Sequence, residues 1–115
     1  MQTGQIDYIE FPVANVARAK RFYGEAFSWT FEDYGPNYAS FADGRMSGGF
    51  NGEAPVRPGG GAPLVIIYAA DLEAMEKKVT GAGAKIVRPT FSFPGGRRFH
   101  FSDPDGHELA VWSDK

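Results

Sequence analysis

The sequence of 115 residues contains no cysteine. This absence excludes disulfide bonds, thiolate zinc sites and a cysteine nucleophile. The sequence also lacks an apolar run of the roughly 18 residues that suggest a membrane-spanning helix. Its N-terminus has none of the charged and apolar segments of a signal peptide. We therefore expect a cytoplasmic protein with no membrane partner.

An excess of positive charge is missing as well. Twelve basic residues stand against 14 acidic ones, which gives a net charge of −2. Proteins that bind the phosphate backbone of nucleic acids usually carry a basic face. The composition therefore predicts no nucleic-acid partner.

Glycine and proline, by contrast, are abundant, with 15 and 8 copies. They stand between short segments rich in Phe, Ile and Val, a pattern typical of many short strands joined by turns. A chain of this length usually forms one domain and is long enough to bury a core. We predict a single domain over residues 1–115.

The N-terminal half of the sequence predicts a strand, a helix and three further strands. Apolar and polar residues alternate over 6–13, as in a half-buried strand. Asn15 is a suitable N-cap for a helix with one apolar stripe. The stripe consists of Ala19, Phe22, Tyr23, Ala26 and Phe27. The further strands are expected near 30–34, 38–42 and 45–50, with hairpin turns between them.

The same order of elements repeats in the C-terminal half. A Pro- and Gly-rich linker over 53–62 precedes an apolar strand and a second helix, which begins after Asp71 and ends near Gly83. Strands follow near 84–88, 97–102 and 108–112. We infer an internal duplication of residues 5–52 and 63–113. One helix per copy covers one sheet face, so the opposite faces either meet or form a cleft.

Several motifs in this order carry a resemblance to a known family. They are a strand ending at Val13, a capped helix with Phe22-Tyr23, a repeat opening at Ala70-Asp71-Leu72, and a closing DPDGHELAVW. Together they resemble the vicinal oxygen chelate superfamily of glyoxalase I, extradiol dioxygenases and fosfomycin and bleomycin resistance proteins. The resemblance covers nearly the whole chain. It implies an α+β fold of two tandem βαβββ modules whose curved mixed sheet encloses a cleft, and it implies a homodimer.

The resemblance also identifies where metal-binding members hold their cation. Those members place a histidine on the first strand of each module and a glutamate on the last strand. The corresponding residues here are Tyr8, Val65 and Ala110. Valine and alanine side chains have no donor atoms, so we expect no bound metal and no other cofactor.

A non-standard metal site is an alternative. A typical catalytic zinc or facial-triad iron site uses three protein ligands, whereas the sequence contains only His100 and His107. Such a site would have to draw on Tyr8, Glu10, His100 or Glu108.

Strand alternation groups the candidate ligand-binding residues by face. Tyr8 and Glu10 share a face of the first strand, and Arg98 and His100 share a face of the penultimate strand. We expect a mostly apolar and aromatic small-molecule pocket lined by Tyr8, Glu10, Phe50, Val65, Ile67, Arg98, His100, Glu108 and Trp112. In an alternative register His100 lies opposite Leu109 and has a structural role.

Two connections in the C-terminal half have recognisable composition. Residues 91–98 are predicted to form a loop, which either is a mobile flap over the pocket or is anchored by Phe91 and Phe93. Residues 103–106, Asp-Pro-Asp-Gly, are predicted to form a type I turn.

Three functions are compatible with these features. The first is a metal-free, small-molecule-binding member of the superfamily, which the replaced metal ligands favour. The second is a metal-dependent lyase, isomerase or dioxygenase of glyoxalase type with a non-standard site, because the chemistry of such enzymes depends on a divalent cation. The third is an accessory or dimerisation domain with a vestigial pocket.

Overall fold

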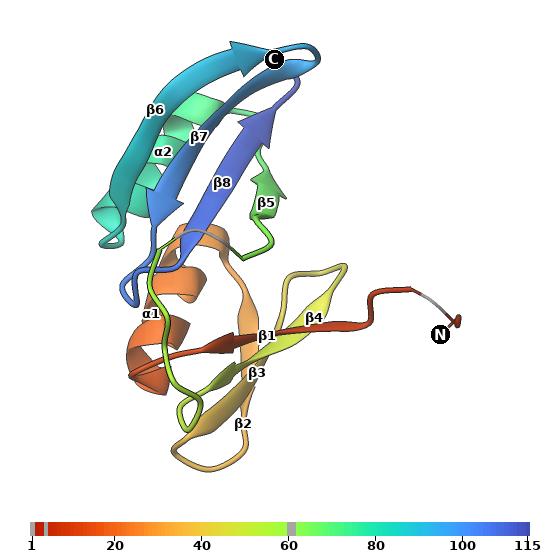
Figure 1. The fold of residues 1–115 in the computed structure, drawn as a ribbon, viewed down its shortest axis with the longest axis vertical. Coiled ribbons are helices and arrows are strands. Elements are labelled where there is room, and N and C mark those ends of the chain that lie inside the picture. Colours follow the sequence, from red (N-terminus) through yellow and green to blue (C-terminus); the bar gives the residue numbers. More distant parts are fainter. Residues whose placement is uncertain (1, 4, 60–61) are drawn as a thin grey trace. The chain divides into compact units, whose positions relative to one another are not determined.

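The computed structural model describes residues 2–3, 5–59 and 62–115. These residues divide into two compact units, Met1–Val56 and Arg57–Lys115. Each unit contains one helix and a mixed four-stranded sheet (Figure 1). The α+β class and the repeated βαβββ order therefore agree with the sequence prediction.

The first unit consists of one helix and four strands. In chain order these are β1 (Tyr8–Pro12), α1 (Val16–Phe27), β2 (Thr30–Asp33), β3 (Tyr38–Ala42) and β4 (Ser47–Asn51). The strands lie in the order β1-β4-β3-β2. β1 runs parallel to β4, and the other two pairs are antiparallel. The last strand of the unit is therefore a central strand of its sheet.

Local capping fixes both ends of α1. The side chain of Asn15 accepts a hydrogen bond from the backbone N–H of Arg18 at 2.9 Å, as predicted for an N-cap. Ser28 ends the helix in the left-handed region, with φ 61°, and its N–H donates to Gly24 O at 3.0 Å. These bonds satisfy backbone groups that a helix leaves without intrahelical partners.

The core of the first unit is aromatic. Tyr23 of α1 stacks on Phe50 of β4 at 5.3 Å between ring centroids, and Phe11 of β1 meets Phe50 edge to face at 6.0 Å. Trp29 stacks on Phe41 of β3 at 4.5 Å. These contacts place α1 on the face of the sheet that carries Phe11, Phe41 and Phe50. Offset and edge-to-face rings add about 0.5–1.5 kcal/mol per pair beyond burial.

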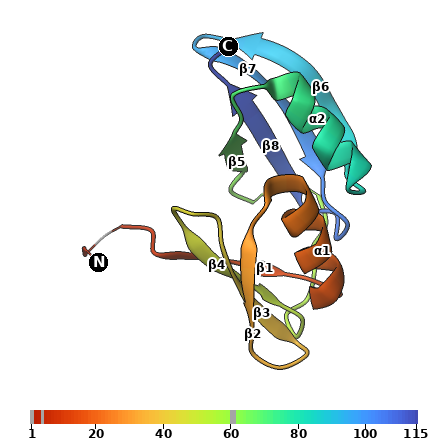
Figure 2. The same cartoon turned by 180° about the vertical axis from the view of Figure 1, so that it is seen from behind.

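The second unit repeats this topology. Its elements are β5 (Val65–Tyr68), α2 (Leu72–Gly81), β6 (Lys85–Phe93), β7 (Gly96–Ser102) and β8 (Glu108–Ser113). The strands lie in the order β5-β8-β7-β6, with β5 parallel to β8. Helix α2 lies against one face of this sheet (Figure 2).

Helix α2 is also capped as the sequence predicts. Asp71 accepts a hydrogen bond from the N–H of Ala74 at 3.0 Å. Beyond the helix, Gly83 has φ 114°, and the N–H of Ala84 donates back to Val79 O at 2.9 Å. A glycine tolerates this left-handed conformation without a Cβ clash, so Gly83 allows the chain to turn from α2 into β6.

The core of the second unit is built from aliphatic and phenylalanine side chains. Its buried residues are Leu72 and Val79 of α2, Phe99 and Phe101 of β7, and Leu109 and Val111 of β8. Arg97 of β7 forms an ion pair with Glu73 of α2 at 2.7 Å. Because Arg97, Phe99 and Phe101 alternate with Arg98 and His100, the latter two lie on the other face.

Two connections differ in how well they were predicted. Residues 91–98 form a hairpin rather than the predicted loop, because β6 extends to Phe93 and β7 begins at Gly96. The turn at Asp103 is confirmed, since Gly106 N–H donates to Asp103 O at 2.9 Å. The register of β6 shifts between Ile86 and Arg88 and again between Arg88 and Phe91.

Of the expected linker over 53–62, residues 60 and 61 lie outside the described residues. Gly59, just before them, forms a bridge with His107, and its N–H donates to Gly106 O at 2.9 Å. The end of the linker thus pairs with the turn before β8. Neither helix is long and apolar enough to cross a membrane, as judged over the described part of the chain.

Candidate functional site

In each unit one sheet face is covered by the unit's own helix. We call the opposite face the helix-free face. In the first unit Tyr8 and Glu10 lie on it, because they alternate with the buried Phe11 along β1. Tyr38 of β3 and Asn51 of β4 lie beside them, since these two residues pair directly in the sheet.

These four side chains form a hydrogen-bonded network, the tyrosine–glutamate network. Tyr38 Oη donates to Glu10 Oε2 at 2.9 Å, and Asn51 Nδ2 donates to Glu10 Oε1 at 3.1 Å. Tyr8 Oη lies 2.7 Å from Tyr38 Oη. Because the single hydroxyl proton of Tyr38 is directed at Glu10, Tyr8 is the donor in this last bond. Tyr8 Oη therefore keeps acceptor capacity for another group.

The network also changes the ionisation of Tyr38. Burial is the largest cause that raises the pKa of Tyr38 above its ordinary value of 10.0, and the hydrogen bonds with Tyr8 and Glu10 raise it further. Both effects disfavour the phenolate, which would lie beside the Glu10 carboxylate. Tyr38 is therefore neutral at physiological pH and donates a hydrogen bond to Glu10.

A glycine creates the space for this network. A Cβ atom on Gly49 of β4 would meet the hydroxyl ends of Tyr38 and Tyr8. Gly49 pairs with Glu10 on one side and with Ser40 on the other. The absence of a side chain at this position lets the two phenols meet across the sheet.

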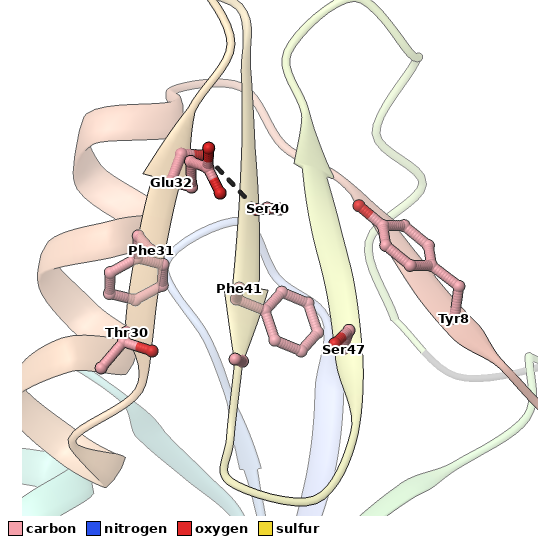
Figure 3. Close-up of a pocket in the computed structure, with 8 residues that line it drawn as sticks. Tyr8, Thr30, Phe31, Glu32, Ser40, Phe41 and Ser47 are labelled. Carbon is pink, nitrogen blue, oxygen red and sulfur yellow. Dashed lines mark hydrogen bonds between the residues drawn. The ribbon is translucent and has the colours of Figure 1, made fainter.

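Next to the network lies a hollow of about 400 Å³ (Figure 3). Its lining combines residues with hydroxyl groups, one glutamate, an alanine and two phenylalanines. The lining residues are Tyr8, Thr30, Phe31, Glu32, Ser40, Phe41, Ala42 and Ser47. Tyr8 belongs to both the hollow and the network. Ligand sites typically have volumes of about 300–1,000 Å³, so the hollow has the capacity for a small organic molecule.

The helix-free face of the second unit contains a histidine–carboxylate pair. His100 Nδ1 lies 2.7 Å from Glu108 Oε2 across β7 and β8. His100 is buried, with only 6% of the residue exposed. Its second nitrogen, Nε2, is buried with no hydrogen-bond partner among the described residues. In the tautomer in which Nδ1–H donates to Glu108, Nε2 presents a lone pair.

Aromatic rings and guanidinium groups surround this pair. The ring of Phe91 lies 5.9 Å from that of His100, and Arg88 stacks over Phe91 at 3.7 Å from the ring centroid. Arg98 lies 5.3 Å from the Phe91 ring and 5.7 Å from that of Phe93. Cation–π contacts of this kind stabilise a guanidinium over a ring. Trp112 completes the surface, 6.4 Å from Phe93.

The structure places six of the nine candidate site residues on the helix-free faces. Tyr8 and Glu10 lie in the first unit, and Arg98, His100, Glu108 and Trp112 lie in the second. His100 pairs with Ala110 rather than with Leu109, so the alternative register is wrong.

The remaining three candidates lie on the helix-covered faces, which corrects the expected lining. Phe50 is fully buried between Tyr23 and Phe11. Val65 and Ile67 pair with the buried Leu109 and Val111. The side chains of β5 on the helix-free face are therefore Ile66 and Tyr68.

Comparison with known proteins places these features in a family. The sequence model of the Glyoxalase/Bleomycin resistance protein/Dioxygenase superfamily matches residues 5–111. The chain belongs to this superfamily. The resemblance deduced from the motifs is thereby confirmed.

Individual relatives agree with this assignment. The chain is 29% identical over 121 residues to CFP32 of Mycobacterium bovis, a provisionally named glyoxylase, and the match covers 95% of this chain. It spans 45% of that relative, about half its length. The fold is similar to that of a glyoxalase-related enzyme from Fulvimarina pelagi, with a TM-score of 0.81 and 20% identity over 96% of this chain and 88% of the other. TnmS3, an antibiotic binding protein from Streptomyces sp. CB03234, gives a TM-score of 0.77 and 22% identity over 98% of both chains.

The residues at the superfamily's metal positions do not fit a divalent cation. Val65 and Ala110 have no donor atoms, and Val65 faces the helix-covered side. The hydroxyl of Tyr8 is hydrogen-bonded to Tyr38. His100 Nδ1 is held by Glu108, and no three His, Cys, Asp or Glu side chains gather into a metal-binding group in the described ranges. We therefore derive no step through a metal.

Sequence analysis missed several residues of the helix-free faces. Tyr38 and Asn51 were not identified because their role depends on the order of β1, β4 and β3. Arg88 of β6 was missed because the register of this strand shifts on both sides of it, between Ile86 and Arg88 and between Arg88 and Phe91. The alternation of Phe91 and Phe93 beside Gly96 was a usable signal for a hairpin with both rings on one face.

Proposed function

We propose that this chain is a metal-free member of the superfamily that binds a small organic molecule in the hollow of its first unit. The observation that carries the proposal is the hollow of about 400 Å³ lined by Tyr8. Tyr8 stands where metal-binding relatives are expected to hold a histidine. A hydroxyl that accepts hydrogen bonds thus replaces a metal ligand.

The lining defines the chemistry of the ligand. Ala42 offers an apolar surface to a ring or an aliphatic group, and Phe31 and Phe41 also border the hollow, although the Phe41 ring itself packs on Trp29 and Phe50 on the helix-covered face. Glu32 and the acceptor lone pairs of Tyr8 Oη favour a ligand that donates hydrogen bonds, such as an alcohol or an amine. The first unit has seven acidic and four basic residues, which also favours a neutral or cationic ligand over an anion.

The comparisons support small-molecule binding only in that a protein with this fold binds such a ligand. TnmS3 has this fold and is an antibiotic binding protein. Enzymes of glyoxalase type share the fold as well, so the fold by itself does not decide between binding and catalysis. The chemistry of the hollow is what favours binding.

Titration with tyramine and benzyl alcohol tests the proposal. Trp29 stacks on Phe41, a lining residue, so its fluorescence should report occupancy of the hollow. A Trp112→Phe background leaves Trp29 as the single tryptophan. We expect saturable quenching that Ala42→Phe abolishes by filling the hollow, while Ser92→Phe in the second unit leaves it unchanged.

Elemental analysis of protein purified without chelators tests the metal-free part. We expect no stoichiometric zinc, nickel, iron or manganese. A stoichiometric metal that raises the unfolding temperature would overturn the proposal in favour of a non-standard metal enzyme. Unaltered Trp29 fluorescence with both probes, together with unaltered NMR spectra, would argue for an accessory domain instead.

A further inference from the structure

The second unit contains a buried proton acceptor that the proposed function does not use. His100 is held through Nδ1 by Glu108 at 2.7 Å, and its Nε2 has no partner among the described residues. Leaving a buried polar nitrogen without a hydrogen bond costs free energy. A group that supplies the missing bond is therefore favoured at this point.

The charges around Nε2 indicate what that group is. The titratable and charged side chains on the helix-free face come from all four strands. They are Lys85 and Arg88 of β6, Arg98 of β7, Glu108 of β8 and Tyr68 of β5. Arg98 contributes a second buried nitrogen, Nε, with no partner among the residues described. Two guanidinium groups beside one histidine favour an anion.

We propose that this face binds an aromatic compound with an acidic hydroxyl group, and that His100 accepts the hydroxyl proton. The ligand O–H bond breaks, and the proton moves to Nε2. The oxygen keeps the electron pair as a phenolate or enolate. Glu108 stabilises the resulting imidazolium through Nδ1–H, and Arg98 neutralises the oxyanion.

The surroundings of His100 fit the aromatic part of such a ligand. Phe91, Phe93 and Trp112 present rings on the same face as His100 and Arg98. Phe91 lies next to the imidazole, with 5.9 Å between the ring centroids, and because Nε2 is buried, a ligand that reaches it has to displace neighbouring side chains. The strand of Phe91 is irregular at this point, since the register of β6 shifts between Arg88 and Phe91. Bulges of this kind are frequent next to functional sites.

The pair of probes 4-nitrophenol and 4-nitroanisole tests the proposal. The two differ in the acidic hydroxyl, which the anisole lacks, and nitrophenolate is distinguished from nitrophenol by its absorption spectrum. A Trp29→Phe background leaves Trp112 as the reporter. We expect 4-nitrophenol to bind about tenfold or more tightly than 4-nitroanisole, as for a hydrogen bond to a charged group. We also expect the bound phenol to ionise at lower pH than the free one.

Three variants separate proton transfer from packing. His100→Gln removes the proton acceptor, and Glu108→Gln keeps the shape but removes the charge that stabilises the imidazolium. Both variants should abolish the preference for 4-nitrophenol over 4-nitroanisole, while 4-nitroanisole still binds. In both, bound 4-nitrophenol should ionise at the same pH as free 4-nitrophenol. His107→Gln, at the other histidine of the chain, is the control and should keep the wild-type preference.

The outcomes distinguish this site from the hollow of the first unit. Equal affinity for the two probes, or an unshifted ionisation of the bound phenol, would overturn the proposal. A Trp112 signal that 4-nitrophenol leaves unaltered would overturn it as well. None of these results affects the Trp29 titrations with tyramine and benzyl alcohol, which test the proposed function independently. A preference that survives in Glu108→Gln would show that the carboxylate is not a positioning residue.

Discussion

The two units share one topology but carry opposite chemistry on their helix-free faces. In the first unit, phenol hydroxyls and the Glu10 carboxylate are hydrogen-bonded to one another beside an acceptor-rich hollow. In the second unit, two arginines and a histidine lie among aromatic rings. The numbers of charged residues differ in the same direction. The first unit has four basic and seven acidic residues, whereas the second has eight basic and seven acidic residues.

This difference shows that the repeated βαβββ order determines which positions face away from the helix, but not what they bind. Gly49 in the first unit and Ala110 in the second pair with Glu10 and Ile66, respectively. The first pair leaves space for the tyrosine–glutamate network, whereas the second pair makes that part of the helix-free face apolar. Duplicated scaffolds can thus hold different sites, because function depends on side chains grafted onto a fold.

The largest expected effect concerns the two cores. Phe50→Ala should lower the free energy of unfolding by about 3–5 kcal/mol, because it leaves a cavity among rings. Phe99→Ala in the second unit also leaves a cavity. We expect the loss to be larger for Phe50→Ala, because this variant also removes ring contacts with Tyr23 and Phe41 at 5.3 and 5.2 Å. Urea denaturation of both variants measures the difference. A larger loss for Phe99→Ala would contradict the view that aromatic packing is concentrated in the first unit.

A smaller loss of stability is expected from substituting the small residue on each helix-free face. Gly49→Ala should cost about 1–3 kcal/mol through overpacking, because its Cβ would meet the hydroxyls of Tyr38 and Tyr8. Ala110→Gly should cost about 0.5–1 kcal/mol through backbone entropy. Thermal unfolding provides the comparison. The Tyr38 ring signals in NMR spectra should shift in the first variant and stay unchanged in the second.

Substitutions at the two helix N-caps should differ less in their effect on stability than substitutions in the two cores. Asn15→Ala and Asp71→Ala each remove one capping hydrogen bond, at 2.9 and 3.0 Å, which is worth about 1 kcal/mol. Asp71 also places a negative charge at the N-terminus of α2, where the helix dipole favours it. We therefore expect the Asp71 variant to be the less stable one at neutral pH, with the gap narrowing as added salt screens the charge. Equal losses at low ionic strength would contradict the dipole contribution.

The smallest effect is expected at an exposed ion pair of the second unit. Arg97 holds the pKa of Glu73 below its ordinary value through a hydrogen bond. A carboxylate with a lowered pKa contributes stability above its unfolded pKa and loses it as the pH falls. Glu73→Gln should therefore flatten the acid side of the stability profile slightly and change the neutral unfolding midpoint less than either cap variant does. Lys20 and Asp33, paired at 2.7 Å in the first unit, offer a matched control through Asp33→Asn.

Local signals made the order of elements predictable from the sequence. Asn15 and Asp71 mark the starts of both helices because each provides its own capping bond within a few residues. The reversal at Asp103 was predictable for the same reason, since its Oδ1 atom accepts from the N–H of Asp105 at 2.9 Å. Such features depend on the neighbouring sequence alone.

The facing of individual strand residues depends on contacts that are distant in sequence. Val65 and Ile67 lie in a continuous apolar run, so alternation gave no indication of their face. Phe50 follows two glycines, and its strand therefore had no side-chain pattern to read. The tyrosine–glutamate network was not predictable because it joins Glu10 to Tyr38 and Asn51, which become neighbours only through the strand order.

The position of the final strand in each unit has a consequence for truncated chains. β4 and β8 come last in their units and yet lie between two partners, and β5 has β8 as its neighbour in the sheet. A fragment that stops before Glu108 would leave the segment Val65-Ile66-Ile67-Tyr68 with unpaired backbone groups and exposed apolar side chains. Such an edge promotes association with other chains. Chains truncated before Glu108 should therefore aggregate, whereas chains that extend through β8 should not.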